Sequence, residues 1–343
     1  MKILPALYIV LAATLALAGM TMESPAAGHV SKFYSGKTVR LVVGYGRGGG
    51  YDTFARLLAP RLERETGIRV VVENKPGNGG LTVLNDAAHA IHSRTVLTVA
   101  NVSAAVTAEL LSLDSARFHF NDLVWLGGIA SDDRVLLTAE GSGLEDWLST
   151  PQTPSVVRWA ALGRTDNLAL SAALLSEAFG LKSRIITGYR GTSDAIAALL
   201  RGKVDAAVVS IETARQYLDT EGLSMAAVLS KTRSRLAPDV PTIYELDIDP
   251  AARKWIDYQV DLSTLGRALI VAPGTPRDDV KFFRTALQRI LTSEEFIAAA
   301  AERGRSVRYT AAGDIENVTA SILGPAAGYD KDELRRVVGA KYF

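Results

Sequence analysis

Short apolar runs alternate with longer amphipathic stretches along most of this 343-residue chain, and this alternation constrains its fold most strongly. Ten runs rich in Val, Ile, Leu and Ala have the length of β-strands: 39–43, 68–72, 95–100, 124–129, 135–139, 156–161, 184–187, 204–209, 225–229 and 268–272. Most intervals between them have the length and patterning of helices. Strands that alternate with helices favour an α/β architecture with mostly parallel sheets.

The interval after the first run illustrates the helical pattern. Its apolar residues recur at i, i+3, i+4 and i+8 and form one stripe: Phe54, Leu57, Leu58 and Leu62. Asp52 precedes this stripe and is expected to be the N-cap of the helix. Pro60 lies inside the stripe and is expected to kink or shorten the helix.

Two polar stretches interrupt the pattern and predict where the chain crosses between two lobes. One is residues 131–134, and the other lies within residues 247–267. We therefore expect a first lobe from two separate segments and a second lobe between them: residues 33–134 and 261–343 for the first, 135–260 for the second. The part after about residue 275 is expected to be helical.

The N-terminus has the pattern of a secretory signal peptide. Lys2 precedes an uncharged apolar stretch over residues 3–18, and small residues follow at 16–19 and 25–27. We predict a signal peptide over residues 1–27 that is cleaved on export. The alternative is an uncleaved anchor, because residues 3–22 are uncharged and just long enough to span a bilayer.

Charge and cysteine content exclude several classes of function. The chain has 38 Lys and Arg against 37 Asp and Glu, so no global field attracts nucleic acid or a membrane surface. It has no cysteine, which removes disulfides, thiolate catalysis and cysteine-bound metals. A chain of this length can instead build large apolar cores.

Two glycine-rich turns each follow an apolar run, and together they predict an anion-binding pocket. The first turn covers residues 44–50 and the second covers residues 74–80. Glycine lets backbone N–H groups approach a ligand closely, and the start of a helix adds partial positive charge. Tight-turn geometry alone would explain a single such turn, but two on neighbouring strands favour a binding site.

The first turn also matches the dinucleotide-binding pattern G-x-G-x-x-G over residues 44–49, with Glu73 where a ribose-binding acid would lie. Three observations count against a nucleotide. The predicted signal peptide directs the chain away from cytoplasmic NAD, and no twin-arginine signal accompanies it. The glycines also continue through Gly50, past the expected start of the helix.

The sequence lacks recognisable catalytic or metal-binding machinery. Neither G-x-S-x-G nor H-E-x-x-H occurs. Of the four histidines, His89 and His92 could share a helix face, but no acidic partner is evident near them. We expect no catalytic residue, metal or cofactor. Asp132 and Asp133 are interpreted as part of a solvated loop. The alternative, an exported enzyme, would need a general base, for which Asp166 and Glu212 are the candidates.

From near Tyr34 to about residue 320, the chain resembles the extracytoplasmic solute receptors of tripartite tricarboxylate transporters, also called Bug receptors. The motifs that carry this resemblance are Gly48-Gly49-Gly50-Tyr51-Asp52, Glu73-Asn74-Lys75-Pro76-Gly77-Asn78-Gly79-Gly80, Tyr189-Arg190-Gly191, Leu200-Arg201-Gly202-Lys203-Val204-Asp205, Pro238-Asp239-Val240-Pro241-Thr242 and Ala272-Pro273-Gly274-Thr275-Pro276. Each motif is weak alone. Their occurrence in this order behind a signal peptide is fairly specific.

The resemblance implies a type II periplasmic-binding-protein fold, with two α/β lobes, two crossing segments and a ligand cleft between them. It implies a monomeric periplasmic receptor without cofactor, which binds a small organic anion, such as a dicarboxylate or an aromatic acid. Membrane permease subunits would be its partners, and nucleic acid would not. A sensor subunit for a membrane kinase is a further alternative.

The resemblance also implies which residues contact the ligand. In the first lobe these are Tyr45, Arg47, Gly48, Gly49, Gly50, Asp52, Thr53, Asn78, Gly79, Gly80 and Ser103; in the second they are Thr165, Asp166, Arg190, Gly191, Thr192 and Ser193. Arg47 departs from the uncharged residue usual in the family, so either it pairs with a carboxylate or it faces solvent. Arg164 and Arg190 are candidates for a distal carboxylate.

Overall fold

The computed structural model describes residues 32–90, 92–144, 156–164, 166–189, 191–217, 221–324 and 330–343. The predicted signal peptide, residues 1–27, lies outside these ranges, as do two expected site residues, Thr165 and Arg190. None of the described helices is both long and apolar enough to cross a lipid bilayer.

Each of the ten apolar runs forms a strand, and one short strand is added near the C-terminus. The strands are β1 (Thr38–Val43), β2 (Arg69–Asn74), β3 (Val96–Asn101), β4 (Val124–Ala130), β5 (Arg134–Ala139), β6 (Val157–Ala160), β7 (Ser183–Ile186), β8 (Ala206–Ser210), β9 (Leu223–Leu229), β10 (Arg267–Val271) and β11 (Thr310–Ala311). Val, Ile and Leu favour strands because their side chains pack well on a pleated surface.

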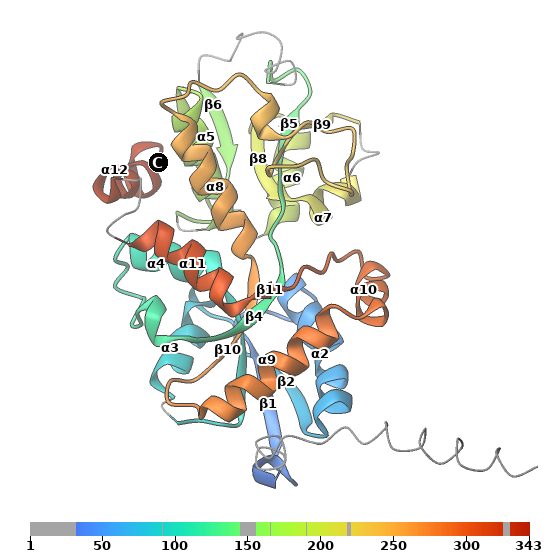
Figure 1. Cartoon of the computed structure of the whole chain (residues 1–343). Coiled ribbons are helices and arrows are strands. Elements are labelled where there is room, and N and C mark those ends of the chain that lie inside the picture. The colour runs from blue at the N-terminus through green and yellow to red at the C-terminus, as the bar shows by residue number, and fades with distance from the viewer. Residues whose placement is uncertain are drawn as a thin grey trace, which may run out of the picture.

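The strands form two separate sheets, which define two lobes (Figure 1). The first has the order β11-β4-β10-β3-β1-β2, and the second has the order β7-β6-β8-β5-β9. In the first sheet β1 is parallel to β2 and β3, whereas β10 is antiparallel to β3 and β4. In the second, β6 is parallel to β7 and β8, whereas β5 is antiparallel to β8 and β9.

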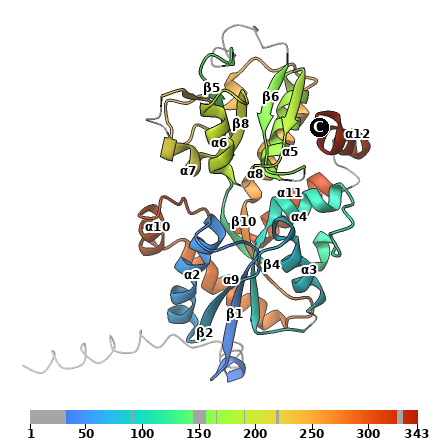
Figure 2. The same cartoon turned by 180° about the vertical axis from the view of Figure 1, so that it is seen from behind.

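Helices cover both sheets (Figures 1 and 2). They are α2 (Gly50–Thr66), α3 (Leu81–His89), α4 (Val102–Leu110), α5 (Asn167–Ala178), α6 (Thr192–Leu200), α7 (Ile211–Ala214), α8 (Arg253–Leu265), α9 (Arg277–Leu291), α10 (Glu294–Ala301), α11 (Ala312–Leu323) and α12 (Lys331–Arg336), followed by the π-helical turn η5 (Val337–Lys341). The apolar stripe expected on α2 is buried, which anchors this helix in the core of the first lobe.

Helix α2 differs from the expectation at both of its marked residues. Its N-cap is Gly49, not Asp52, and the carboxylate of Asp52 accepts the N–H of Gly48 from within the first turn. The helix also continues past Pro60 to Thr66. Asp52 therefore acts as an acid at N3 that bonds back to the turn, an arrangement related to the capping box.

The two crossing segments lie directly against each other. Residues 131–133 join β4 to β5, and Gly266 joins α8 to β10. The N–H of Asp132 donates to the carbonyl of Ser263 over 2.8 Å. Gly266 has φ 39° and ψ −122°, and a Cβ there would lie 2.0 Å from the carbonyl oxygen of Ala130. The backbones approach so closely that only glycine fits between them.

The last described residues contact the second lobe. The N–H of Ile185 in β7 donates to the carbonyl of Tyr342 over 2.8 Å. The hydroxyl of Tyr342 donates to Glu177 of α5 over 2.6 Å. Strand β10 and helices α9 and α10, in contrast, lie with the first lobe (Figure 1).

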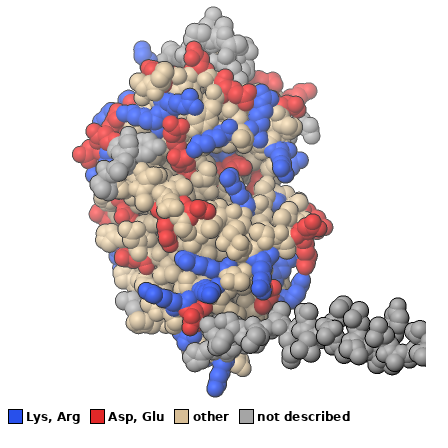
Figure 3. All heavy atoms as spheres, viewed as in Figure 1, with Lys and Arg blue, Asp and Glu red and all other residues tan. Residues whose placement is uncertain are grey.

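Charged side chains of both signs are interspersed over the face shown in Figure 3. This distribution accompanies a formal net charge of +1. No broad single-sign patch on this face would steer a polyanion toward the protein.

Candidate functional site

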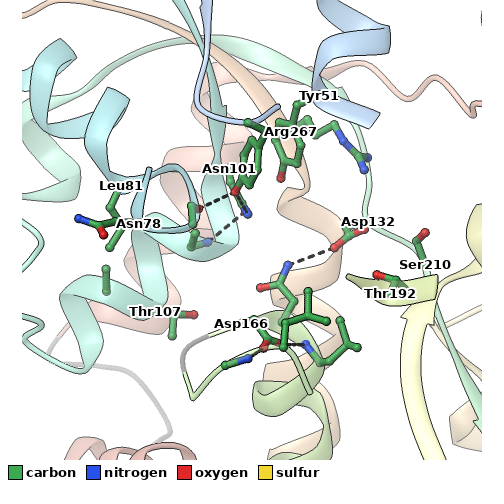
Figure 4. Close-up of a pocket in the computed structure, with 18 of the residues that line it drawn as sticks. Tyr51, Asn78, Leu81, Asn101, Thr107, Asp132, Asp166, Thr192, Ser210 and Arg267 are labelled. Carbon is green, nitrogen blue, oxygen red and sulfur yellow. Dashed lines mark hydrogen bonds between the residues drawn. The ribbon is translucent and has the colours of Figure 1, made fainter. Parts of the chain in front are cut away.

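A cavity of about 470 Å³ lies between the two lobes. It is lined by residues from both lobes and from both crossing segments: Tyr45, Tyr51, Asn78, Gly79, Leu81, Asn101, Ala104, Thr107, Ala108, Leu113, Asp132, Arg134, Leu162, Gly163, Asp166, Asn167, Leu168, Thr192, Ser210 and Arg267. Figure 4 shows several of these side chains around the cavity. A volume of this size suits a small molecule.

The structure brings only part of the expected site to this cavity. Tyr45, Asn78, Gly79, Asp166 and Thr192 line it. Other expected residues are described but do not line it: Arg47, Gly48, Gly49, Gly50, Asp52, Thr53, Gly80, Ser103, Gly191 and Ser193. Helices α3, α5 and α6 each begin with a residue that lines the cavity: Leu81, Asn167 and Thr192. The N-terminal ends of α3 and α6 therefore bring partial positive charge to the cavity, whereas that of α5 is capped by the carboxylate of Asp166.

The second glycine-rich turn reaches the cavity through an unusual backbone. Asn78, Gly79 and Gly80 all have positive φ, at 46°, 63° and 94°. The hydroxyl of Tyr45 donates to the carbonyl of Gly79 over 2.6 Å, and a Cβ on Gly80 would lie 2.8 Å from that hydroxyl oxygen. Glycine at position 80 therefore allows Tyr45 to join the two turns.

Tyr45 is itself held by two neighbours. Its ring stacks on that of Tyr51, with the centroids 4.2 Å apart. The side-chain amide of Asn101 donates to its hydroxyl over 2.9 Å. Burial raises the pKa of Tyr45 and of Tyr51, so both hydroxyls stay protonated at neutral pH. Tyr45 of the first turn and Tyr51 of α2 thus contribute two neutral aromatic side chains to the wall.

The glycines of the first turn do not line the cavity. Arg47, Gly48 and Gly49 are exposed. Asp52 is 3% exposed and fixes the turn by accepting from Gly48 N–H at 2.8 Å, Arg56 Nε at 2.9 Å and Asn74 Nδ2 at 2.9 Å. The role of Asp52 in the structure is to shape the turn.

The pKa of Asp52 predicts how stability changes in acid. Burial would raise this pKa, but the hydrogen bonds from Arg56, Gly48 and Asn74 outweigh burial and lower it to about 2. The ionised carboxylate therefore stabilises the fold by about 2 kcal/mol above pH 4, and this contribution is lost as pH falls toward 2. Urea unfolding from pH 5 to pH 2 should show a smaller acid loss for Asp52→Asn than for the wild type. Parallel curves would contradict the assignment.

In the second lobe, Asp166 caps α5. Its carboxylate accepts from Leu168 N–H at 2.7 Å and Ala169 N–H at 3.0 Å, and it also accepts from Gly163 N–H. Glu212, the other residue considered as a general base, accepts from Arg305 at 2.8 Å and from Ser306 N–H at 2.9 Å. Both carboxylates are therefore engaged by donors of the protein.

Two further expected residues are engaged in structural contacts. Ser103 is buried and its hydroxyl donates to the carbonyl of Leu262 over 2.9 Å. Arg164 donates to the carbonyl of Gly339 over 3.3 Å, and its guanidinium lies 4.6 Å from the ring centre of Phe343. Neither residue lines the cavity.

The crossing segments supply charged residues that the sequence interpretation missed. Asp132 was expected in a solvated loop, but it is only 9% exposed and lines the cavity. It is bound by Arg134, whose Nη2 lies 2.6 Å from its Oδ2, and by Asn167 at 3.3 Å. Arg267 begins β10 and is 7% exposed. In the sequence, the only signal for Arg267 is that a cation directly precedes an apolar run. Its place in the cavity depends on the contact between the two crossing segments, which the sequence does not reveal.

The charges of this group support one another. Burial alone would raise the pKa of Asp132, but Arg134 and Arg267 outweigh it and hold the pKa below its usual range. Burial opposes the charge of Arg267, yet Tyr51, Asp132 and Glu212 hold its pKa above the usual value. Asp132 and Arg267 are therefore both charged at neutral pH.

An apolar part of the lining complements these polar groups. It comprises Leu81, Ala104, Ala108, Leu113, Leu162 and Leu168. Within the described ranges, no group of three or more His, Asp or Glu side chains is arranged to hold a metal ion. The cavity can therefore offer charge, hydrogen bonds and an apolar surface to one small molecule.

Comparison with known proteins gives a family match over most of the chain. A family model described as the tripartite tricarboxylate transporter family receptor, TctC, matches residues 54–322. Protein BugT of Bordetella pertussis is 28% identical over 221 residues, which cover 62% of this chain and 67% of BugT. The matched family is one of receptors and not of enzymes, so the expectation of a non-catalytic protein is confirmed.

Solved structures show the same fold. A TctC solute binding protein from Polaromonas, without ligand, aligns with a TM-score of 0.68 at 22% identity, covering 89% of this chain and 99% of that protein. The R. palustris protein Rpa4515 with adipate aligns with a TM-score of 0.68 at 19% identity, covering 88% of this chain and 97% of that protein. The expected two-lobed α/β receptor fold is confirmed.

Proposed function

Because this chain belongs to the tripartite tricarboxylate transporter family of receptors, we propose that it binds a small organic carboxylate and delivers it to the membrane permease of such a transporter. The interlobe cavity carries this proposal. Its lining combines the hydroxyls of Tyr51, Thr192 and Ser210 with the guanidinium of Arg267 and the starts of α3 and α6. Such groups bind anions without a reacting side chain.

The proposed ligand is a dicarboxylate or an aromatic acid. A cavity of about 470 Å³ has room for an acid with several carbon atoms. The structural neighbour Rpa4515 was crystallised with adipate, a linear dicarboxylate, which supports an acid of this kind. The apolar part of the lining would contact the carbon skeleton.

The proposed site of action is the periplasm. The basic start and apolar stretch at the N-terminus have the pattern of a cleaved signal peptide over residues 1–27. A periplasmic receptor meets solutes before they reach the inner membrane, where the permease would accept the loaded protein. Sequencing the N-terminus of the protein recovered from the periplasm would test both the cleavage and the location.

A thermal-shift screen of the purified protein tests ligand binding. Malate, adipate, citrate and benzoate would be compared with glucose and putrescine. A ligand at about 100 times its dissociation constant adds about 2.7 kcal/mol of stability, which should raise the melting temperature by roughly 3 °C or more. At least one acid should produce this shift, and isothermal titration should then give one site per chain.

The screen can also contradict the proposal. If glucose or putrescine stabilises the protein and no acid does, the ligand is not a carboxylate. Transport is tested separately by the uptake of the radiolabelled acid in cells with and without the receptor gene. Unchanged uptake with an intact binding site would contradict delivery to a permease and leave the binding assignment standing.

A further inference from the structure

Arg267 is a buried cation that has no ion-pair or hydrogen-bond partner in the part of the chain that the structure describes. It is 7% exposed, it forms no ion pair there, and none of its side-chain N–H groups donates a hydrogen bond there. Its Nε is fully buried. Its guanidinium lies 4.8 Å from the ring centre of Tyr51 and 5.5 Å from that of Phe54. Arg267 nevertheless lines the interlobe cavity and a small pocket beside it.

The carboxylates near Arg267 are committed to other arginines. Asp132 is bound by Arg134 at 2.6 Å, and Glu212 is bound by Arg305 at 2.8 Å. A buried charge without a close counter-charge costs considerable free energy. A bound anion next to Arg267 would offset this cost, so this wall of the cavity favours a negative group.

The start of α2 adds to the positive potential around Arg267. The guanidinium lies so close to Gly50 that a Cβ there would be 3.0 Å from Nη2. The N-cap of this helix, Gly49, provides no side-chain hydrogen bond to the first turn. The ionised Asp52 in the first turn offsets part of the positive end of α2, and the guanidinium of Arg267 remains the charge that favours an anion here.

The opposite side of the cavity has a different chemistry. Helix α4 contributes Ala104, Thr107 and Ala108, and Leu81 lies beside them. In Figure 4, Thr107 and Leu81 lie on the other side of the cavity from Arg267. The hydroxyl of Thr107 is buried and has no hydrogen-bond partner among the described residues. The apolar side chains of Leu81, Ala104 and Ala108 favour a hydrocarbon chain or a ring on this side. The hydroxyl of Thr107 is placed to form one hydrogen bond with that body.

We propose that Arg267 receives the carboxylate of the ligand and that the α4 side receives an apolar body, so the ligand is an acid with a methylene chain or an aromatic ring. This inference rests on the proposed receptor function and deepens it. It assigns the anion to a guanidinium on the second crossing segment and not to the backbone of the first glycine-rich turn. Because that segment joins the lobes, the ligand would contact both lobes and the connection between them.

Isothermal titration with adipate, benzoate and malate tests the proposal. Arg267→Gln should weaken the binding of adipate or benzoate by about 30-fold or more, as expected for the loss of a charged hydrogen bond. Arg267→Lys should restore part of the affinity, because it keeps the charge but not the planar fork. Arg69→Gln, which removes an exposed arginine of β2, is the matched control and should leave binding unchanged.

A measurement on the wild-type protein keeps the test valid if Arg267→Gln does not fold. Adipamide has the length of adipate but no charge, and it should bind at least about 30-fold more weakly. Equal binding of adipamide, or less than a threefold loss in Arg267→Gln, would overturn the proposal. If Arg47→Gln weakens acid binding strongly and Arg267→Gln does not, the carboxylate binds at the first glycine-rich turn and the proposal is wrong. Tighter binding of malate than of adipate and benzoate would overturn the apolar assignment.

Failure of the underlying function has a different signature. If the wild-type protein binds none of the acids but binds a neutral or cationic solute, the proposed carboxylate receptor function is wrong. The proposed role of Arg267 is then wrong as well. If the wild type binds an acid and Arg267→Gln binds it equally well, only the role of Arg267 is wrong.

Discussion

Replacing Gly266 by alanine should destabilise the folded protein by about 3 kcal/mol or more. The new Cβ would lie 2.0 Å from the carbonyl oxygen of Ala130 and 2.8 Å from the backbone of Ser131. Alanine would also have to adopt φ 39° and ψ −122°. Relief requires the two crossing segments to separate, which would disturb both lobes. Urea unfolding at neutral pH gives the change in free energy directly.

Gly313→Ala is the matched control for this prediction. Gly313 lies in the first turn of α11, and a Cβ there would meet no atom within 4 Å. Alanine in that helix should be neutral or slightly stabilising. If Gly266→Ala unfolds within about 1 kcal/mol of the wild type, the crossing segments do not form the rigid contact described above.

Replacing Asp132 by alanine should cost about 3 kcal/mol, because it leaves Arg134 buried without its partner. Arg134 is 7% exposed, and two of its nitrogens, Nε at 3.1 Å and Nη2 at 2.6 Å, donate to Asp132 Oδ2. The pKa of Asp132 lies below the usual value of an aspartate despite burial, because Arg134 and Arg267 favour the carboxylate. The ionised form therefore stabilises the fold at every pH above the pKa of an aspartate in the unfolded chain. This contribution is lost as pH falls through the lowered pKa. Equilibrium unfolding as a function of pH measures both effects.

The neighbouring Asp133 provides a control with the opposite sign. Burial raises the pKa of Asp133 above its usual value, so its ionised form costs stability at neutral pH. Asp133→Ala should therefore be neutral or slightly stabilising at pH 7. Equal losses in both variants would show that the segment is sensitive to any substitution, and that the ion pair of Asp132 has no special part in stability.

Helix α8 shows what the composition of the second crossing stretch did not reveal. Residues 247–267 were interpreted as a polar crossing stretch, but residues 253–265 form a helix that buries Trp255, Ile256 and Tyr258. The same helix also buries the polar residues Gln259 and Ser263, which bond to each other over 3.1 Å. These polar residues interrupt the apolar pattern of the helix in the sequence. They can be buried because they form a hydrogen bond with each other, and composition does not reveal that bond.

The glycine-rich turns show a similar limit at the site. Glycine content indicated that both turns were tight and close to a ligand. The second turn lines the cavity with Asn78 and Gly79, whereas at the first turn the cavity is lined by Tyr45 and by the adjacent Tyr51. Two large rings on either side of a glycine run decide which atoms of that turn face the cavity, and their stacking is a contact that glycine content does not reveal.

The sequence by itself determined the strands, the apolar stripe of α2 and the receptor family. These features follow from local periodicity and from short motifs in a fixed order. Only the tertiary structure decided that the charged residues Asp132, Arg134 and Arg267 line the cavity, beside the expected Asp166. Asp132 and Arg267 lie far apart in the chain and meet because the crossing segments are in contact at Gly266. Burial and pairing depend on such long-range contacts, which no local pattern encodes.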